Sequence, residues 1–380
     1  MKTNNVLLQN IQIYAPEDLG VQDILLCGGK IVAIGRSLRP NLPDLRTLDG
    51  RGLRALPGFL DQHVHVTGGG GEAGFRSRVP ELTLTDFTLN GVTTVVGVLG
   101  TDSVTRTVES LLAKTKALNE EGITAYCLTG AYDLPSPTIT GSVKRDVAFL
   151  SEVLGVKAAI ADHRSSQPLW QQLAKVAAQV RLGALTAGKM GVVHLHTGRG
   201  KGGLRIVQEV LEHTDLPISH FRPTHVGNCL ESALAFGAQG GRIDFTAEED
   251  PEKSVWQLFQ AREQVPWEQI TLSSDAGGSL PVWNDRGEMI GLGVGNMQGP
   301  YQVVRHLITN YDLPAEQALP LITSHVAQGL GLKEKGQIAV GMDGDLVLVD
   351  EDWSIHTVFA RGRRMVSQGE PKVLPFLQRQ

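Results

Sequence analysis

Residues 103–133 read "SVTRTVESLLAKTKALNEEGITAYCLTGAYD" and place a helical stretch directly before a candidate β-strand. The same order recurs at residues 168–198, where "PLWQQLAKVAAQVRLGALTAG" comes before "GVVHLHTG". Strands that alternate with helices favour a parallel sheet with helical crossover connections. We therefore expect an α/β fold in this part of the chain.

Eight candidate strands lie between residues 57 and 330. Eight β/α units in about 270 residues match the expected size of a closed barrel of parallel strands. The sequence therefore predicts a (β/α)8 TIM-like barrel over residues 57–330. The candidates are "LDQHVHV" (60–66), "TTVVGVLG" (93–100), "TAYCLTGAYD" (124–133), "VKAAIAD" (156–162), "GVVHLHTG" (191–198), "SHFRPTHV" (219–226), "RIDFTAEE" (242–249) and "ITLSSDAGG" (270–278).

Both ends of the chain lack this alternation and contain short apolar runs separated by turn residues. The N-terminal part includes "VLLQNIQIYA" and "KIVAIG", and the C-terminal part includes "DLVLVDED" and "HTVFARG" after the strong turn signal "MDGD". Because the two ends share this β character, we expect them to form one small β domain. Its halves are residues 1–56 and 331–380, with the barrel inserted between them.

The composition is that of an ordinary soluble globular protein, with 41% hydrophobic and 20% charged residues. The formal net charge is −5 and no run is rich in Lys or Arg, so a small-molecule partner is favoured over nucleic acid. No segment resembles the apolar part of a secretory signal, and none approaches the roughly 20 apolar residues of a membrane span. We expect a cytoplasmic protein that does not bind membranes.

Six of the eight candidate strands carry a possible metal ligand or catalytic polar group at or near their C-terminal end. In a (β/α)8 barrel these ends surround the active site. We therefore expect the side chains to meet in one site, although chance alone would supply one or two of them. They are His63, His65, Tyr132, Lys157, His194, His196, His225 and Asp275.

Two pairs of histidines are spaced for a shared strand face. His63 and His65 lie two residues apart, as do His194 and His196, so each pair points to one side of its strand. Neutral imidazoles together with a carboxylate suit zinc or another first-row divalent ion. The alternative for the first pair is two hydrogen-bonded core histidines, and for His194 it is a supporting or packing role.

Lys157 lies between two apolar runs in "GVKAAIAD" and is predicted at the active end of a strand. A buried, unpaired ammonium is expensive, so an ordinary solvated or ion-paired lysine is one reading. The other is a lysine that has reacted with carbon dioxide to form an anionic carbamate, whose two oxygens can bridge two metal ions. Only the neutral amine reacts, and a cationic neighbourhood favours that form.

The motifs "PGFLDQHVH" (57–65) and "SSDAGGS" (273–279) resemble those of the binuclear metal-dependent amidohydrolase superfamily. Within it, "HVHVTGGGGEAG" (63–74), "GAYDLPSPTITGS" (130–142) and "PTHV" (223–226) are similar to the isoaspartyl (β-aspartyl) dipeptidases. The resemblance implies two divalent ions held by nitrogen and oxygen ligands, which serve zinc, manganese, cobalt and iron; we expect zinc. The implied ligands are His63 and His65 at one ion, His196 and His225 at the other, Lys157 as the bridging carbamate, and Asp275 at the first ion.

The resemblance also implies a set of residues around the substrate. Glu72 would hold a free α-amino group, and Tyr132 would donate to the polarised carbonyl oxygen. Arg164 and Ser279 would bind carboxylate or backbone groups. Asn228 stands where the family has an arginine, so its place in the substrate site leaves open a shifted dipeptide preference. From the residues alone, Glu72 could instead be an exposed loop carboxylate, Tyr132 a rim aromatic, Arg164 a surface ion pair and Ser279 a turn residue.

The activity implied by the resemblance is hydrolysis of the isopeptide bond of β-aspartyl dipeptides by a metal-bridging hydroxide, with Asp275 carrying the proton. The enzyme would be a metallo-dipeptidase and a homo-oligomer. A related amidohydrolase that opens a cyclic amide, as dihydroorotases and hydantoinases do, or that cleaves an N-acyl amino acid, is the nearest alternative. A non-catalytic protein that keeps the barrel as a scaffold is the remote one, since such a protein is expected to lose metal ligands.

Overall fold

The computed structural model describes residues 5–283, 286 and 289–377. Its central feature is a sheet of eight parallel strands, each hydrogen-bonded to the next along the chain. The strands are β6 (Phe59–Val64), β7 (Val92–Gly97), β8 (Thr124–Gly130), β9 (Val153–Ile160), β10 (Val192–Thr197), β11 (Phe221–Thr224), β12 (Ile243–Thr246) and β13 (Ile270–Ser273). All eight strands coincide with the candidates read from the sequence.

The first and last strands of this sheet meet and close it into a barrel. A parallel bridge joins Val64 to Ala276. The amide of Asp275 donates to the carbonyl of His63 at 3.1 Å, and the amide of His65 donates to the carbonyl of Ala276 at 2.8 Å. The predicted (β/α)8 barrel is confirmed, and its seam is formed by backbone groups of candidate site residues.

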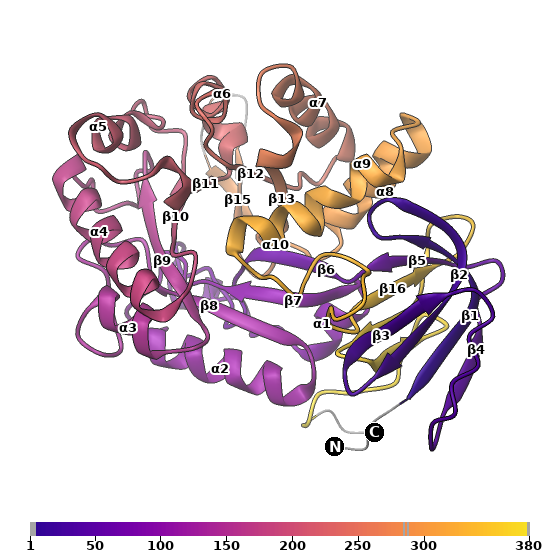
Figure 1. Cartoon of the computed structure of the whole chain (residues 1–380). Helices are drawn as coiled ribbons and strands as arrows, with labels where there is room; N and C mark the ends of the chain where they lie inside the picture. Colours follow the sequence, from indigo (N-terminus) through magenta and orange to yellow (C-terminus); the bar gives the residue numbers. More distant parts are fainter. Residues whose placement is uncertain (1–4, 284–285, 287–288, 378–380) are drawn as a thin grey trace.

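Helices surround the barrel on its outside (Figure 1). They are α1 (Leu84–Thr88), α2 (Val108–Glu121), α3 (Val143–Phe149), α4 (Trp170–Ala187), α5 (Arg205–His213), α6 (Leu230–Ala238), α7 (Pro251–Arg262), α8 (Gly299–Asn310), α9 (Ala315–Ala318) and α10 (Ser324–Leu330). Helix α2 begins later than residue 103 because Thr107 caps it, accepting a hydrogen bond from the amide of Ser110 at 3.2 Å. Helix α4 ends at Ala187 and is capped by Gly188, which has the left-handed conformation typical of the residue after a helix.

The barrel strands are covered on both faces, and polar side chains near their ends are therefore buried. All eight residues of β9 and all six of β10 are buried, as expected for parallel strands with helices outside and packed side chains inside. Four of these residues, Lys157, His194, His196 and Thr197, are polar. Their burial requires partners within the protein, which the site supplies.

A second sheet combines strands from the two ends of the chain, as predicted. Its strands are β1 (Val6–Tyr14), β2 (Asp18–Cys27), β3 (Lys30–Gly35), β4 (Arg46–Asp49), β5 (Arg54–Pro57), β16 (Leu346–Val349), β17 (Ile355–Ala360), β18 (Arg363–Ser367) and β19 (Glu370–Pro371). The two halves join where β5 pairs antiparallel with β16. Figure 1 shows the N-terminal strands in indigo beside the C-terminal strand β16. The domain limits at residues 56 and 331 stay predictions.

A short antiparallel hairpin of β14 (Ser279–Trp283) and β15 (Met289–Val294) follows the last barrel strand. This hairpin was not predicted from the sequence. The hairpin begins at Ser279, so it carries a candidate site residue at its first position.

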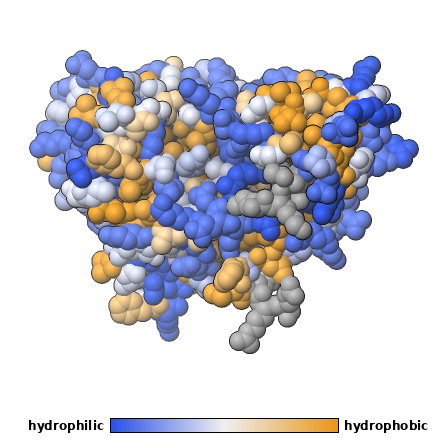
Figure 2. Space-filling view, turned by 60° about the horizontal axis from the view of Figure 1, so that its bottom comes forward, coloured by the Kyte–Doolittle hydropathy of each residue, from blue (hydrophilic) through white to orange (hydrophobic). Residues whose placement is uncertain are grey.

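No helix among the described residues is both long and apolar enough to cross a membrane. On the face shown in Figure 2, hydrophobic residues form separate patches with hydrophilic residues between them.

Candidate metal centre and substrate pocket

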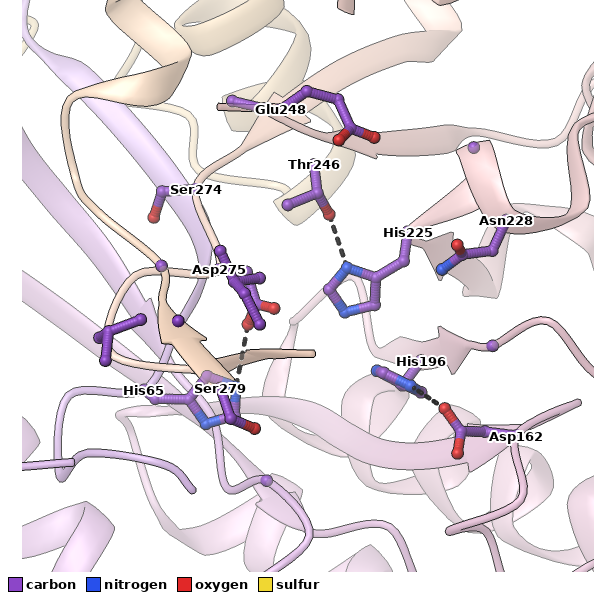
Figure 3. Close-up of a pocket in the computed structure, with 18 of the residues that line it drawn as sticks. His65, Asp162, His196, His225, Asn228, Thr246, Glu248, Ser274, Asp275 and Ser279 are labelled. Atoms are coloured by element: carbon purple, nitrogen blue, oxygen red, sulfur yellow. Dashed lines mark hydrogen bonds and ion pairs between the residues drawn. The ribbon is translucent and has the colours of Figure 1, made fainter. Parts of the chain in front are cut away.

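A cavity of about 910 Å³ opens at the ends of the barrel strands. Its lining includes His65 after β6, His196 in β10, His225 after β11 and Asp275 after β13. Figure 3 shows these four side chains gathered around one space. The barrel therefore brings together residues that lie far apart in the sequence.

His63 lies behind this lining and is fully buried. Its Nδ1 lies 2.8 Å from Nε2 of His194, and its Nε2 lies 3.1 Å from Nζ of Lys157 and 3.4 Å from Oδ1 of Asp275. Nε2 of His65 lies 3.0 Å from the same carboxylate oxygen. Both histidines of the first pair thus direct Nε2 towards Asp275, whereas His194 contacts the ring of His63 and does not line the cavity.

His225 and Asp275 reach the site from an uncommon backbone conformation. Their φ angles are 58° and 53°, in the left-handed region that residues other than glycine seldom adopt. Nδ1 of His225 lies 2.6 Å from Oγ1 of Thr246, a contact drawn as a dashed line in Figure 3. Its Nε2 is buried and has no hydrogen-bond partner among the described residues.

One potential ligand atom from each of His63, His225 and Asp275 lies within 4.8 Å of the other two. Ligand atoms that share one zinc ion at about 2.0–2.2 Å are separated by up to about 4 Å, so this group is close to the dimensions of a metal site. The unpaired Nε2 of His225 also lacks the partner that buried polar atoms normally have. These residues fit a metal centre of one ion or of two neighbouring ions.

The protonation states in this site suit metal binding. Burial, with a further contribution from Lys157, lowers the pKa of His63 well below its usual value, and burial does the same for His225. Burial lowers the pKa of His196 to about 4. The rings are therefore neutral at pH 7, as metal ligands must be. Burial also lowers the pKa of Lys157 to about 7, so that the neutral amine is well populated.

His196 is contacted through both ring nitrogens. Its Nε2 lies 2.8 Å from Oδ2 of Asp162, and its Nδ1 lies 2.9 Å from the hydroxyl of Tyr132. Arg164 donates to the same carboxylate. Asp162 was absent from the predicted site residues, yet it ends the candidate strand "VKAAIAD". The rule that placed the other residues at strand ends was the signal that could have found it.

Glu72 lies in the loop after β6 and lines the cavity. Its Oε1 accepts hydrogen bonds from Oγ of Ser279 at 2.6 Å, from Oγ1 of Thr101 at 3.2 Å and from Nη1 of Arg164 at 3.2 Å. Burial raises the pKa of this carboxyl, but the hydrogen bonds and the Arg164 charge outweigh burial and lower it. Glu72 is therefore ionised, and its Oε2 is buried without a hydrogen-bond partner in the described part of the chain.

The glycines before Glu72 allow its loop to pass close to the neighbouring backbone. Gly68 and Gly70 have φ angles of 75° and 79°. A Cβ atom at Gly68 would lie 2.0 Å from the carbonyl oxygen of Val79, and one at Gly70 would lie 2.3 Å from that of Ser77. Only glycine fits both the conformation and the space, so these residues determine where Glu72 stands.

Asn228 and Arg199 line another part of the same cavity. Nδ2 of Asn228 donates to the carbonyl of Thr197 at 3.3 Å. Arg199 is exposed, and no ion-pair partner for its guanidinium is found among the described residues. The pocket thus contains one cation, Arg164, that is already paired with carboxylates, and a second that is available to a ligand.

The site residues predicted from the sequence all lie in this cavity or directly behind it, and the roles assigned to them stay predictions. The lining includes His65, Glu72, Tyr132, Arg164, His196, His225, Asn228, Asp275 and Ser279, while His63 and Lys157 are buried behind it.

Comparisons with known proteins agree with this geometry, although no protein-family model matches the chain. The crystal structure of the β-aspartyl dipeptidase of Fervidobacterium islandicum AW-1 in complex with the dipeptide β-Asp-Leu is 38% identical, with a TM-score of 0.92. The similarity covers 98% of this chain and 100% of that chain.

More distant similarities also extend over nearly the whole chain. The D-hydantoinase of a Thermus species is 17% identical, with a TM-score of 0.68 over 97% of each chain. The allantoinase of Deinococcus radiodurans is 24% identical over 96% of this chain and 91% of its own length. Three observations support one family assignment. They are the barrel, the cluster of histidines and a carboxylate, and the 38% identity over nearly the whole chain. The chain belongs to the β-aspartyl dipeptidase family of the amidohydrolase superfamily, a group of metal-dependent hydrolases.

Proposed function

We propose that this protein hydrolyses the isopeptide bond of β-aspartyl dipeptides with two bound divalent ions. The observation that carries the proposal is the ionised carboxylate of Glu72, which lines the cavity with Oε2 unpaired. A β-aspartyl dipeptide has a free α-ammonium group that such an oxygen can bind, whereas a cyclic amide has none. The 38% identical relative that was solved with β-Asp-Leu supports the same substrate class.

The metal ligands we propose combine neutral imidazoles with anionic oxygens, and zinc is the ion we expect. When bound, two such ions supply a hydroxide at neutral pH and polarise the scissile carbonyl group. The neutral amine of Lys157 is the form that reacts with carbon dioxide, which would convert it into a bridging carbamate. The proposed ligands are His63, His65 and Asp275 at one ion, His196 and His225 at the other, and carboxylated Lys157 between them.

Asp275 and Tyr132 are the proposed catalytic residues. The neighbouring His225 and His65 hold the pKa of Asp275 well below its usual value despite burial, so its carboxylate is available to take a proton from the attacking water. Asp275 would then deliver that proton to the departing amine. Burial raises the pKa of Tyr132, which keeps its O–H available to donate to the carbonyl oxygen as negative charge develops there.

Each charged group of a β-aspartyl dipeptide has a proposed partner in the pocket. Ser279, Thr101 and Arg164 occupy Oε1 of Glu72 and leave Oε2 for the ammonium group. The aspartyl α-carboxylate is attached to the same carbon as the ammonium, so Arg164 beside Glu72 is its proposed partner. By elimination, Arg199 takes the C-terminal carboxylate of the dipeptide.

A comparison of matched substrates tests this proposal. N-succinyl-leucine differs from β-Asp-Leu only in lacking the α-amino group. Glu72→Gln should lower kcat/KM for β-Asp-Leu about 10- to 100-fold, which corresponds to loss of a charged hydrogen bond, and should change turnover of N-succinyl-leucine little. The control is Glu81→Gln, which removes a carboxylate outside the pocket.

The outcomes separate the candidate functions. Preferred turnover of β-Asp-Leu with this dependence on Glu72 supports the dipeptidase. Turnover confined to dihydroorotate or hydantoins would show a cyclic amidase instead, and preference for N-succinyl-leucine would show an N-acyl amino acid hydrolase. A folded protein that binds no metal and turns over none of these compounds would be a scaffold.

A further inference from the structure

Asp162 lies between the proposed metal centre and the proposed substrate site. It is only 5% exposed. Its Oδ2 lies 2.8 Å from Nε2 of His196, a contact drawn as a dashed line in Figure 3. On its other side, Arg164 donates from Nε to Oδ1 at 3.0 Å and from Nη2 to Oδ2 at 2.9 Å. One carboxylate thus contacts a proposed metal ligand and a proposed substrate ligand.

The surrounding backbone fixes the carboxylate in this place. The amide of Arg164 donates to Oδ1 of Asp162 at 2.8 Å, and the side chain of Gln167 donates to the Asp162 carbonyl, also at 2.8 Å. A Cβ atom at Gly198 would lie 2.6 Å from Oδ2. Glycine at this position therefore leaves the room that the carboxylate occupies, and a larger residue would displace it.

The contacts of Asp162 determine where His196 carries its hydrogen. Arg164 forms an ion pair with this carboxyl group and donates to it from both Nε and Nη2, so Asp162 is present as the carboxylate. An ionised carboxylate only accepts hydrogen bonds, so Nε2 of His196 must be the donor. In the neutral ring the lone pair is then on Nδ1, the nitrogen that lies 2.9 Å from the Tyr132 hydroxyl.

We propose that Asp162 is a positioning residue that fixes the tautomer and orientation of His196 for binding a metal ion through Nδ1, while it holds Arg164 for the substrate carboxylate. This inference rests on the metal centre of the proposed function. Carboxylates that accept a hydrogen bond from a metal-binding histidine orient the ring and increase its basicity. Here the same carboxylate also orients an arginine, so metal binding and substrate binding share one support.

Metal affinity measurements on Asp162→Asn and Arg164→Gln distinguish this role from simple anchoring of Arg164. Asparagine has nearly the same size, but its amide N–H₂ can donate to Nε2 and select the wrong tautomer. We expect Asp162→Asn to weaken binding of one of the two ions about 10- to 100-fold. Arg164→Gln should keep both ions and raise KM for β-Asp-Leu, because the contact between Asp162 and His196 remains.

Zinc content after dialysis against graded concentrations of a chelator is the direct measurement, with circular dichroism to confirm that each variant is folded. Gly198→Ala is the second variant, because it retains Asp162 and moves its carboxylate away from His196. It should weaken binding of one ion as well. If both Asp162→Asn and Gly198→Ala bind two ions as tightly as the unaltered protein and change only KM, Asp162 merely anchors Arg164 and the inference is wrong.

The result for the unaltered protein separates this inference from the proposed function. Two ions per chain with turnover of β-Asp-Leu support the proposed function, whatever the Asp162 variants do. If the unaltered protein binds no metal, the proposed function fails, and the inference about Asp162 fails with it. If it binds two ions and Asp162→Asn also binds two equally well, only the inference fails.

Discussion

At the scale of single residues, Lys157 has no exposed surface, and a cationic side chain in that position would be costly. If it is carboxylated, Lys157→Ala should remove both the bridging oxygens and most of the bound metal. Activity should fall below one per cent, by the order of magnitude that loss of an essential metal ligand implies. Acetate or propionate should restore part of it by supplying oxygen ligands in the space left. Unchanged metal content in Lys157→Ala would contradict the carbamate.

Arg199 provides a second residue-scale prediction. Arg199→Gln should raise KM for β-Asp-Leu about 10-fold or more, because a charged hydrogen bond to the C-terminal carboxylate is lost. It should have little effect on β-Asp-leucinamide, in which that carboxylate is an amide. Lys201→Gln is the matched control, since Lys201 lies in the same loop and does not line the cavity. Equal effects of Arg199→Gln on both substrates would argue against this contact.

Sequence reasoning was most successful for residues at strand ends. It predicted that His63, His196 and Asp275 lie close together because the barrel fold itself fixes where strand ends meet, and their roles stay predictions. It missed the contact between Asp162 and His196 because those residues are separated by 34 positions, and hydrogen bonds between side chains of different strands leave no periodic pattern. His194 was left between two readings that only the 2.8 Å contact with His63 decides.

At the scale of elements, the glycine loop before Glu72 connects the proposed metal ligands of β6 to the proposed substrate ligand Glu72. Gly70→Ala should displace this loop, because the new Cβ would lie 2.3 Å from the carbonyl oxygen of Ser77. We expect a rise in KM with metal content unchanged. Gly74→Ala is the control, since Gly74 also has a positive φ, 88°, but open space around it. A loss of metal in Gly70→Ala would show that the loop also supports the metal centre.

Helix α10 contributes a pH dependence of stability. Its His325 is buried, with Nδ1 3.0 Å from the carbonyl of Ile270 in β13, and burial lowers its pKa to about 4. The unfolded chain, with a histidine pKa of about 6.5, binds a proton first on acidification. Folding is therefore destabilised as the pH falls from about 6.5 to 4, by up to about 3 kcal/mol.

The comparison with His325→Gln tests this dependence, because glutamine can keep a donor to Ile270 but does not titrate. Unfolding of metal-free protein by urea at several pH values is the measurement, so that loss of metal does not contribute. The free energy of unfolding should fall more steeply with acidification in the unaltered protein than in the variant. Parallel pH curves would show that His325 is already charged in the folded state.

Most elements were predictable, and the exceptions have physical causes. Each of the eight barrel strands is preceded or followed by a helical pattern that marks its limits. Helix α2 starts at Val108 because the capping by Thr107 overrides the helical composition that begins at residue 103. The hairpin of β14 and β15 was missed because it follows "SSDAGG", where the glycines were read only as part of the metal-binding motif.

At the scale of the whole molecule, the proposed metal ligands connect strands around the barrel. They come from β6, β9 and β10 and from the segments after β6, β11 and β13. Bound ions should therefore stabilise the closed barrel against unfolding, by about 2.7 kcal/mol at a free metal concentration of 100 Kd for one site. Removal of metal by a chelator should lower Tm, and added zinc should restore it. A Tm that does not change when metal is removed would show that the ions do not stabilise the folded barrel.

The positions of Thr101, Arg199 and Asn228 have a consequence for how this enzyme can change. All three line the cavity from loops after strands, and none is a proposed metal ligand. A gene library randomised at these codons would therefore vary the lining of the cavity and leave the proposed metal ligands unchanged. We therefore expect substitutions at these positions to change substrate preference while the proposed metal ligands are retained.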